Sequence, residues 1–119
     1  IAILLIAVVA VGARPAAATG PGFCMIDGKK VDTAISQSQC DALMSFYGTT
    51  GGDLHWINKT GWDYHDSDPC SVTNPWFGVT CQGGYVAGLV VPGNGLDGWL
   101  PDQLEDLPAL ISVDIHNNN

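Results

Sequence analysis

The residues best suited to chemistry lie together in a short acidic segment, residues 63–68, whose sequence is Asp-Tyr-His-Asp-Ser-Asp. Carboxylate and imidazole groups of this kind could hold calcium or a transition metal. The segment lacks the glycine and the distal glutamate of an EF-hand loop. A solvated acidic loop is therefore the favoured interpretation, and we expect no metal.

No group of side chains predicts catalysis. His55 and His116 have no Ser or Cys arranged beside them as a nucleophile and base, so no triad can be named. There is no phosphate-binding glycine fingerprint, because the glycines at 83, 84, 93, 95 and 98 belong to turns. We expect no enzymatic activity in this segment and no cofactor, although a kinase domain could lie beyond it.

The cysteines form an even set of four in a short chain: Cys24, Cys40, Cys70 and Cys81. In a secreted protein such a set predicts disulfide bonds and leaves three possible connectivities. Sequence order favours Cys24–Cys40 and Cys70–Cys81. A zinc site is the rival interpretation, but it is weak because the chain has no C-x-x-C pair and its histidines are widely spaced.

Asn58 starts an N-glycosylation sequon, Asn58-Lys59-Thr60, in a stretch typical of a loop. Export is indicated by the almost wholly apolar residues 1–11 and by Ala16-x-Ala18, which fits a signal-peptide cleavage site. A membrane anchor is the rival, but the apolar run is shorter than the roughly 20 residues that span a bilayer. We expect a truncated signal peptide over residues 1–18 and a secreted or cell-surface protein.

The charge of the chain excludes some partners. It has 12 acidic and 4 basic residues, for a net charge of −8. This balance offers no basic surface to nucleic acid, and an anionic membrane surface would repel it. The acids are scattered rather than gathered in a block, which indicates a solvated surface rather than an acidic interaction tail.

A repeat in the last third of the chain organises the elements that would position a site. Four pairs of positions match at an offset of 24: Val86 and Leu110, Leu89 and Val113, Val91 and Ile115, Asn94 and Asn118. Apolar residues alternate around Leu89 and Val91, as in a strand with one buried face, and Leu96 extends the apolar lining. The amide of Asn94 can pair backbone groups that the turning chain leaves unpaired. Stable arrays need about three or more units, so we expect the amino-terminal portion of a longer protein.

A helix is predicted before the repeat, because Cys40, Leu43, Met44 and Tyr47 fall on one helical face. The sequence at 38–41 has the form of a capping box, and Gly48 can end the helix. Residues 20–33 are expected to form a loop. Residues 49–81 show little periodicity, and we expect them to be ordered by buried tryptophans and cross-links.

The segment at 94–101, NGLDGWLP, resembles the N-x-L-x-G-x-[LI]-P segment of the plant-type leucine-rich repeat, which has 24-residue units. The segments at 42–52 and 76–81, ALMSFYGTTGG and WFGVTC, look like the amino-terminal cap of the same family. The resemblance implies a Cys70–Cys81 bridge, core aromatics at Trp62 and Trp76, and a strand from Val79. Trp99 departs from the family pattern. It is either an exposed binding aromatic or a residue packed under the cap.

The expected fold class is α/β, the start of a leucine-rich repeat solenoid with a disulfide-bonded helical amino-terminal cap. We expect a signal peptide at 1–18, a linker containing Cys24 at 19–37, the cap at 38–85, and one full and one partial repeat at 86–119. The cap would shield the open end of the solenoid from water.

In a solenoid the outward strand positions form the concave ligand-binding face. Residues 88, 90 and 92 offer little chemistry there, whereas Ser112, Asp114 and His116 could hydrogen-bond a peptide or sugar. Ordinary solvent-facing residues are an equally good interpretation. The resemblance implies an extracellular module that recognises protein, peptide or glycan ligands. The alternatives are a structural or adhesive cell-surface repeat protein and the ectodomain of a receptor-like kinase.

Overall fold

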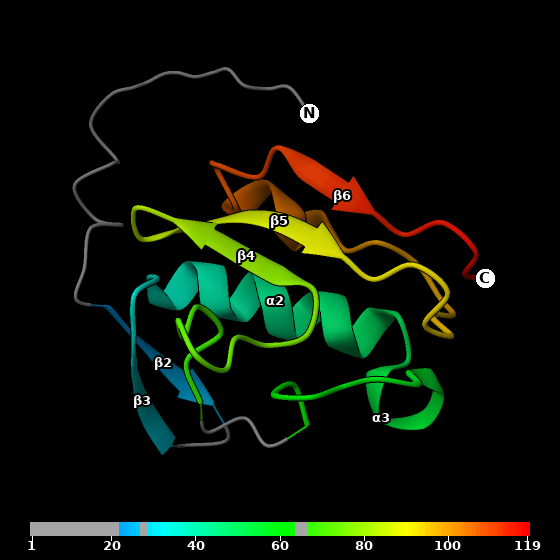
Figure 1. Cartoon of the computed structure of the whole chain (residues 1–119), viewed down its shortest axis with the longest axis horizontal. Helices are drawn as coiled ribbons and strands as arrows, with labels where there is room; N and C mark the ends of the chain where they lie inside the picture. The colour runs from blue at the N-terminus through cyan, green and yellow to red at the C-terminus, as the bar shows by residue number, and fades with distance from the viewer. Residues whose placement is uncertain (1–21, 27–28, 64–66) are drawn as a thin grey trace.

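The computed structural model describes residues 22–26, 29–63 and 67–119. In chain order its elements are β2 (Gly22–Ile26), β3 (Lys29–Thr33), α2 (Gln37–Thr49), α3 (Gly52–His55), β4 (Val79–Gln82), β5 (Tyr85–Val90), the 3₁₀ helix η2 (Asp102–Asp106) and β6 (Ser112–Asp114). Helix α2 runs between the β2–β3 hairpin and the β4–β5–β6 sheet (Figure 1). The described structure is thus a small mixed α/β unit. The predicted signal peptide at 1–18 lies outside the described residues.

The segment predicted to be a loop and linker is instead an antiparallel hairpin, and that prediction is wrong. Strands β2 and β3 pair from Gly22↔Thr33 to Ile26↔Lys29. A Cys24–Cys40 disulfide, with Cα atoms 5.7 Å apart, ties the hairpin to α2. Both sulfur-bearing side chains are fully buried, so the cross-link forms part of the core.

Helix α2 begins at Gln37, one residue before the predicted cap, and continues through Gly48 to Thr49. The predicted capping box at 38–41 is therefore wrong. Gln39 points inward instead: its Nε2 donates to Gly84 O at 3.2 Å, and its Oε1 accepts from Val86 N at 2.9 Å. These bonds satisfy a buried polar side chain and fix α2 against the β4–β5 turn. The expected apolar face is confirmed: Cys40, Leu43 and Tyr47 are buried and Met44 is partly buried against the core. Phe46 is buried on the same helix.

Trp62 lies at the centre of a buried aromatic cluster. Its ring centroid is 5.6 Å from that of Tyr47, 4.9 Å from that of Trp56 and 5.1 Å from that of Trp76. The indole N–H groups are paired, since Trp62 Nε1 donates to Phe77 O at 2.9 Å and Trp56 Nε1 to Thr50 Oγ1 at 3.1 Å. Aromatic packing with paired polar edges orders this irregular part of the chain, as the sequence predicted.

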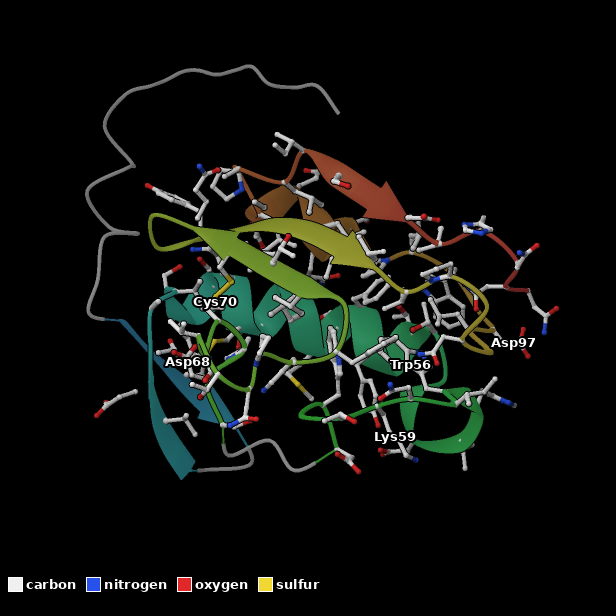
Figure 2. The ribbon with its side chains drawn as sticks, in the orientation of Figure 1. Trp56, Lys59, Asp68, Cys70 and Asp97 are labelled. Atoms are coloured by element: carbon white, nitrogen blue, oxygen red, sulfur yellow. A yellow bond between two sulfur atoms is a disulfide. The ribbon has the colours of Figure 1, made fainter. Side chains whose placement is uncertain are left out.

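The three-stranded sheet has the order β4–β5–β6, with β4 antiparallel and β6 parallel to β5. Strand β4 begins at Val79, as expected. Cys81, near its end, is bonded to Cys70 with Cα atoms 5.6 Å apart (Figure 2). Both disulfides have the connectivity that sequence order favoured. In the parallel pair Leu89 lies opposite Val113, so the sequence offset of 24 is the register offset of the two strands.

Candidate functional site

Two asparagines at equivalent repeat positions hold the end of the sheet in place. Asn118 Oδ1 accepts from Asn94 N at 2.9 Å and from Leu96 N at 3.0 Å. Its Nδ2 donates to Val91 O and to Ile115 O, each at 2.9 Å. One side chain therefore pairs backbone groups of two successive 24-residue units of the sequence, which is the role predicted for an asparagine at this position.

Asn94 makes the corresponding bonds to an earlier part of the chain. It is only 3% exposed. Its Oδ1 accepts from Asn58 N at 2.8 Å and its Nδ2 donates to Asn58 O at 2.8 Å. Ile57 N also donates to Asn94 O at 2.9 Å. The loop around Asn58 is thus docked on the first repeat by its backbone, which leaves the Asn58 side chain free for another role.

The outward face of the sheet is defined by the strand register. Thr80 pairs with Gly88, and Gly88 pairs with Ser112, so these positions form one row across β4, β5 and β6. Val90 pairs with Asp114 in the next row. A Cβ added to Gly88 would collide with Thr80 Oγ1. The Thr80 hydroxyl therefore occupies the space that a side chain at position 88 would take, and Gly88 is buried beneath it.

The three predicted ligand-face residues lie together at the exposed edge strand. Ser112 and His116 are exposed and Asp114 is partly exposed. The carboxylate of Asp114 contacts His116 Nδ1 and also accepts from His116 N at 3.2 Å. These hydrogen bonds, side chain first and backbone second, hold the pKa of Asp114 below its usual range. The arrangement offers a ligand an oriented carboxylate, an imidazole and a hydroxyl.

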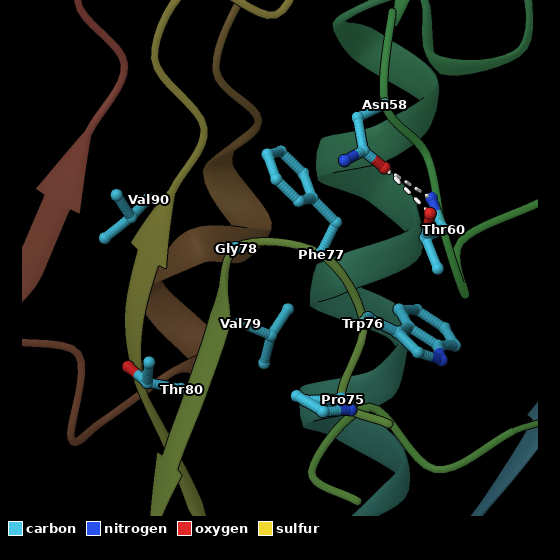
Figure 3. A pocket seen from close by; sticks show the side chains of 9 residues that line it. All are labelled: Asn58, Thr60, Pro75, Trp76, Phe77, Gly78, Val79, Thr80 and Val90. Carbon is cyan, nitrogen blue, oxygen red and sulfur yellow. Dashed lines mark hydrogen bonds between the residues drawn. The ribbon is translucent and has the colours of Figure 1, made fainter. Parts of the chain in front are cut away.

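A surface pocket of about 490 Å³ adjoins this face where β4 begins (Figure 3). Its lining includes Asn58, Thr60, Phe77, Thr80 and Val90. Sequence reasoning missed this pocket, because its residues come from two loops and two strands. The only local sequence feature that could have indicated the pocket is the run of mostly apolar residues that ends at Val79.

Apolar side chains remain exposed along the outer edge of the second repeat. Val113 is 46% and Ile111 85% exposed, although the repeat pattern predicted a buried position at 113. The difference arises because β6 is paired on one side only, with β5, among the described residues. Trp99 is 69% exposed, so the structure does not pack it under the cap.

The acidic segment does not form a described metal site. Residues 64–66 lie outside the described residues, and Asp68 Oδ1 accepts from Cys70 N at 2.8 Å in a local turn (Figure 2). In the part of the chain that the structure covers, no three His, Cys, Asp or Glu side chains gather closely enough to hold a metal ion. Within the same part, none of the helices has the length and apolarity needed to cross a bilayer.

Part of the sequence is similar to that of a known protein. Over 61 residues, 51% of the chain, the sequence is 38% identical to a probable inactive receptor kinase of Arabidopsis thaliana. The chain spans 8% of the length of that relative. No protein-family model matches the sequence, and no solved structure matches it. The chain therefore shares a segment with a plant receptor kinase, and this segment and the two disulfides are consistent with a cell-surface location.

Proposed function

We propose that this chain is the capped amino-terminal end of a leucine-rich repeat ectodomain, an extracellular module that recognises a protein, peptide or glycan ligand. The observation that carries the proposal is the parallel pairing of β5 with β6 at the repeat offset, together with the two asparagines 24 residues apart. Repeated units that stack in register form a continuous sheet, whose outward face is available to ligands.

The proposed ligand face consists of Ser112, Asp114 and His116 at the β6 edge. Its groups can donate and accept hydrogen bonds in the geometry that a peptide backbone or a sugar hydroxyl requires. Two strands present less than the roughly 800 Å² per partner of a standard interface. We therefore propose that this face contributes one end of a larger binding surface.

The similarity to a receptor kinase favours one form of this function, the ectodomain of a receptor-like kinase. In that form the module is linked to a membrane and a kinase-like domain through other parts of the protein. A structural or adhesive cell-surface repeat protein is the alternative, in which the same face binds no defined ligand.

The test is a selection from a peptide display library and a glycan array against the oxidised, secreted chain. Ligands of the proposed face should lose at least tenfold in affinity on Asp114→Asn or His116→Ala, about 1.4 kcal/mol. Glu105→Gln, on η2, removes one exposed acidic charge outside the sheet and serves as the control. Ligands that bind all three variants equally would place recognition elsewhere, and a complete lack of ligands would favour the structural alternative.

A further inference from the structure

The N-glycosylation sequon lies at the edge of the pocket beside β4. Asn58 and Thr60 line the pocket, together with Phe77 and Val90. Both sequon residues are exposed, whereas Phe77 is half-buried beside them. A group attached to Asn58 would therefore start at the rim of a pocket with an aromatic ring in its wall.

We propose that Asn58 carries an N-linked glycan and that the first sugar of this glycan occupies the pocket against Phe77. The proposal rests on the proposed extracellular function, because N-glycosylation occurs in the secretory pathway. It goes beyond that function by assigning an occupant to the pocket. Nothing else in the described structure fills this hollow.

The chemistry requires an amide nitrogen that is free to react. In the transfer, Asn58 Nδ2 forms a bond to C1 of the sugar and loses a proton. The bond from C1 to the diphosphate of a lipid-linked oligosaccharide donor breaks, and the lipid diphosphate leaves with the bonding electrons. Glycosylation usually precedes complete folding, so the folded structure must then leave the modified nitrogen an open path to solvent.

The structure meets that requirement. Asn58 Oδ1 accepts from Thr60 N at 3.1 Å and from Thr60 Oγ1 at 2.8 Å, whereas Nδ2 makes no hydrogen bond to any described residue. In Figure 3 this nitrogen points away from Thr60, towards the side on which the Phe77 ring lies. Lys59 Nζ donates to Asp53 O at 2.8 Å, so its long side chain is held towards α3 and away from the pocket.

The pocket also suits a sugar in size and chemistry. Its volume of about 490 Å³ lies within the range of roughly 300–1,000 Å³ that is typical of small-molecule sites. Phe77 and Val90 supply apolar surface for the C–H face of a pyranose ring. Thr80 is exposed at the other side of the pocket, where its hydroxyl can pair with a sugar hydroxyl.

An occupied pocket has a consequence for recognition. The glycan would cover the part of the sheet face near Thr80 and Val90, which is the end closest to the cap. The outer edge at Asp114 and His116 would remain open. A ligand of the proposed face would then approach from the β6 side.

The test uses the full chain, directed into the secretory pathway of a eukaryotic host by a signal peptide of that host. Mass spectrometry before and after peptide N-glycosidase treatment should show a glycan on the wild type and on Thr60→Ser, and none on Asn58→Gln or Thr60→Ala. A wild-type chain that is secreted with both disulfides formed but without a glycan would overturn this proposal alone. A chain whose four thiols stay free in this compartment would overturn the proposed function as well.

A second measurement tests whether the first sugar occupies the pocket. Endoglycosidase treatment leaves a single N-acetylglucosamine, and this form should melt about 2–5 °C above the same variant made without glycans, in which Asn58 is unchanged, if the sugar packs on Phe77. The difference should disappear in Phe77→Ala and in the milder Phe77→Leu, and it should persist in Leu54→Ala, whose exposed side chain lies outside the pocket. A difference that survives both Phe77 variants would show that the sugar does not pack there.

Discussion

Replacing Asn94 by alanine tests whether its side chain holds the Asn58 loop in place. The variant loses two hydrogen bonds of 2.8 Å, one to Asn58 N and one to Asn58 O. Each such bond contributes about 1 kcal/mol net, and a buried group left unpaired adds to the loss. Because Asn94 is 3% exposed, water can replace its amide only in part. We expect the free energy of unfolding to fall by about 2–3 kcal/mol.

The matched control is Asn119→Ala. Asn119 is exposed. Its backbone N–H donates to Leu96 O at 2.9 Å, and its side chain makes no hydrogen bond to any described residue. Its replacement should change the free energy of unfolding by less than about 0.5 kcal/mol. Urea denaturation of the oxidised proteins, followed by tryptophan fluorescence, measures both. If Asn94→Ala cost no more than Asn119→Ala, the docking of the Asn58 loop by hydrogen bonds would be refuted.

Three further changes test other parts of the structure. Replacing Cys70 and Cys81 together by serine should lower the free energy of unfolding by about 3 kcal/mol, since the bridge closes a loop of 11 residues; urea denaturation measures this, and an unchanged midpoint would contradict it. Trp62→Phe should cost about 2–3 kcal/mol, because it shrinks a fully buried side chain and leaves one carbonyl unpaired; a native near-ultraviolet dichroism spectrum would establish that the fold persists. His116→Ala should raise the pKa of Asp114 towards its ordinary value, since the contact with His116 favours the carboxylate. In the wild type the contact should persist at neutral pH and weaken only as acid protonates Asp114 below its usual range. NMR titration of the carboxyl carbon measures the pKa, and an unaltered pKa would refute the assigned cause.

The parts of the structure that could be predicted from the sequence follow from the spacing of apolar residues, either within one helix or strand or from one repeat unit to the next. The sequence offset of 24 between Leu89 and Val113 is also their register in the parallel pair of strands, as repeated units that stack in register require. The spacing of Cys40, Leu43 and Tyr47 predicted the buried side of α2. In each case the signal lies within one element or repeats at a fixed distance.

The parts that could not be predicted depend on partners far apart in the sequence. Gln39 bonds to Gly84 and Val86, at separations of 45 and 47 residues, and no local pattern reports such a contact. The β2–β3 hairpin does have a local sequence signal, the Asp27-Gly28 dipeptide between its strands, which is typical of tight hairpin turns. The lining of the pocket comes from three separate segments, around residues 58–60, at residues 75–80 and at Val90, so only the fold brings it together.

The backbone and the side chain of Asn58 have separate roles. Asn94 binds only its backbone, so the docking of the loop does not depend on the side chain at position 58. Asn58→Gln keeps the backbone groups and loses only exposed bonds to Thr60. In protein made without glycans it should therefore cost less than about 0.5 kcal/mol, well below the cost of Asn94→Ala. A cost as large as that of Asn94→Ala in the same denaturation assay would mean that the Asn58 side chain is structural, and a bulky group on its amide nitrogen would then be excluded.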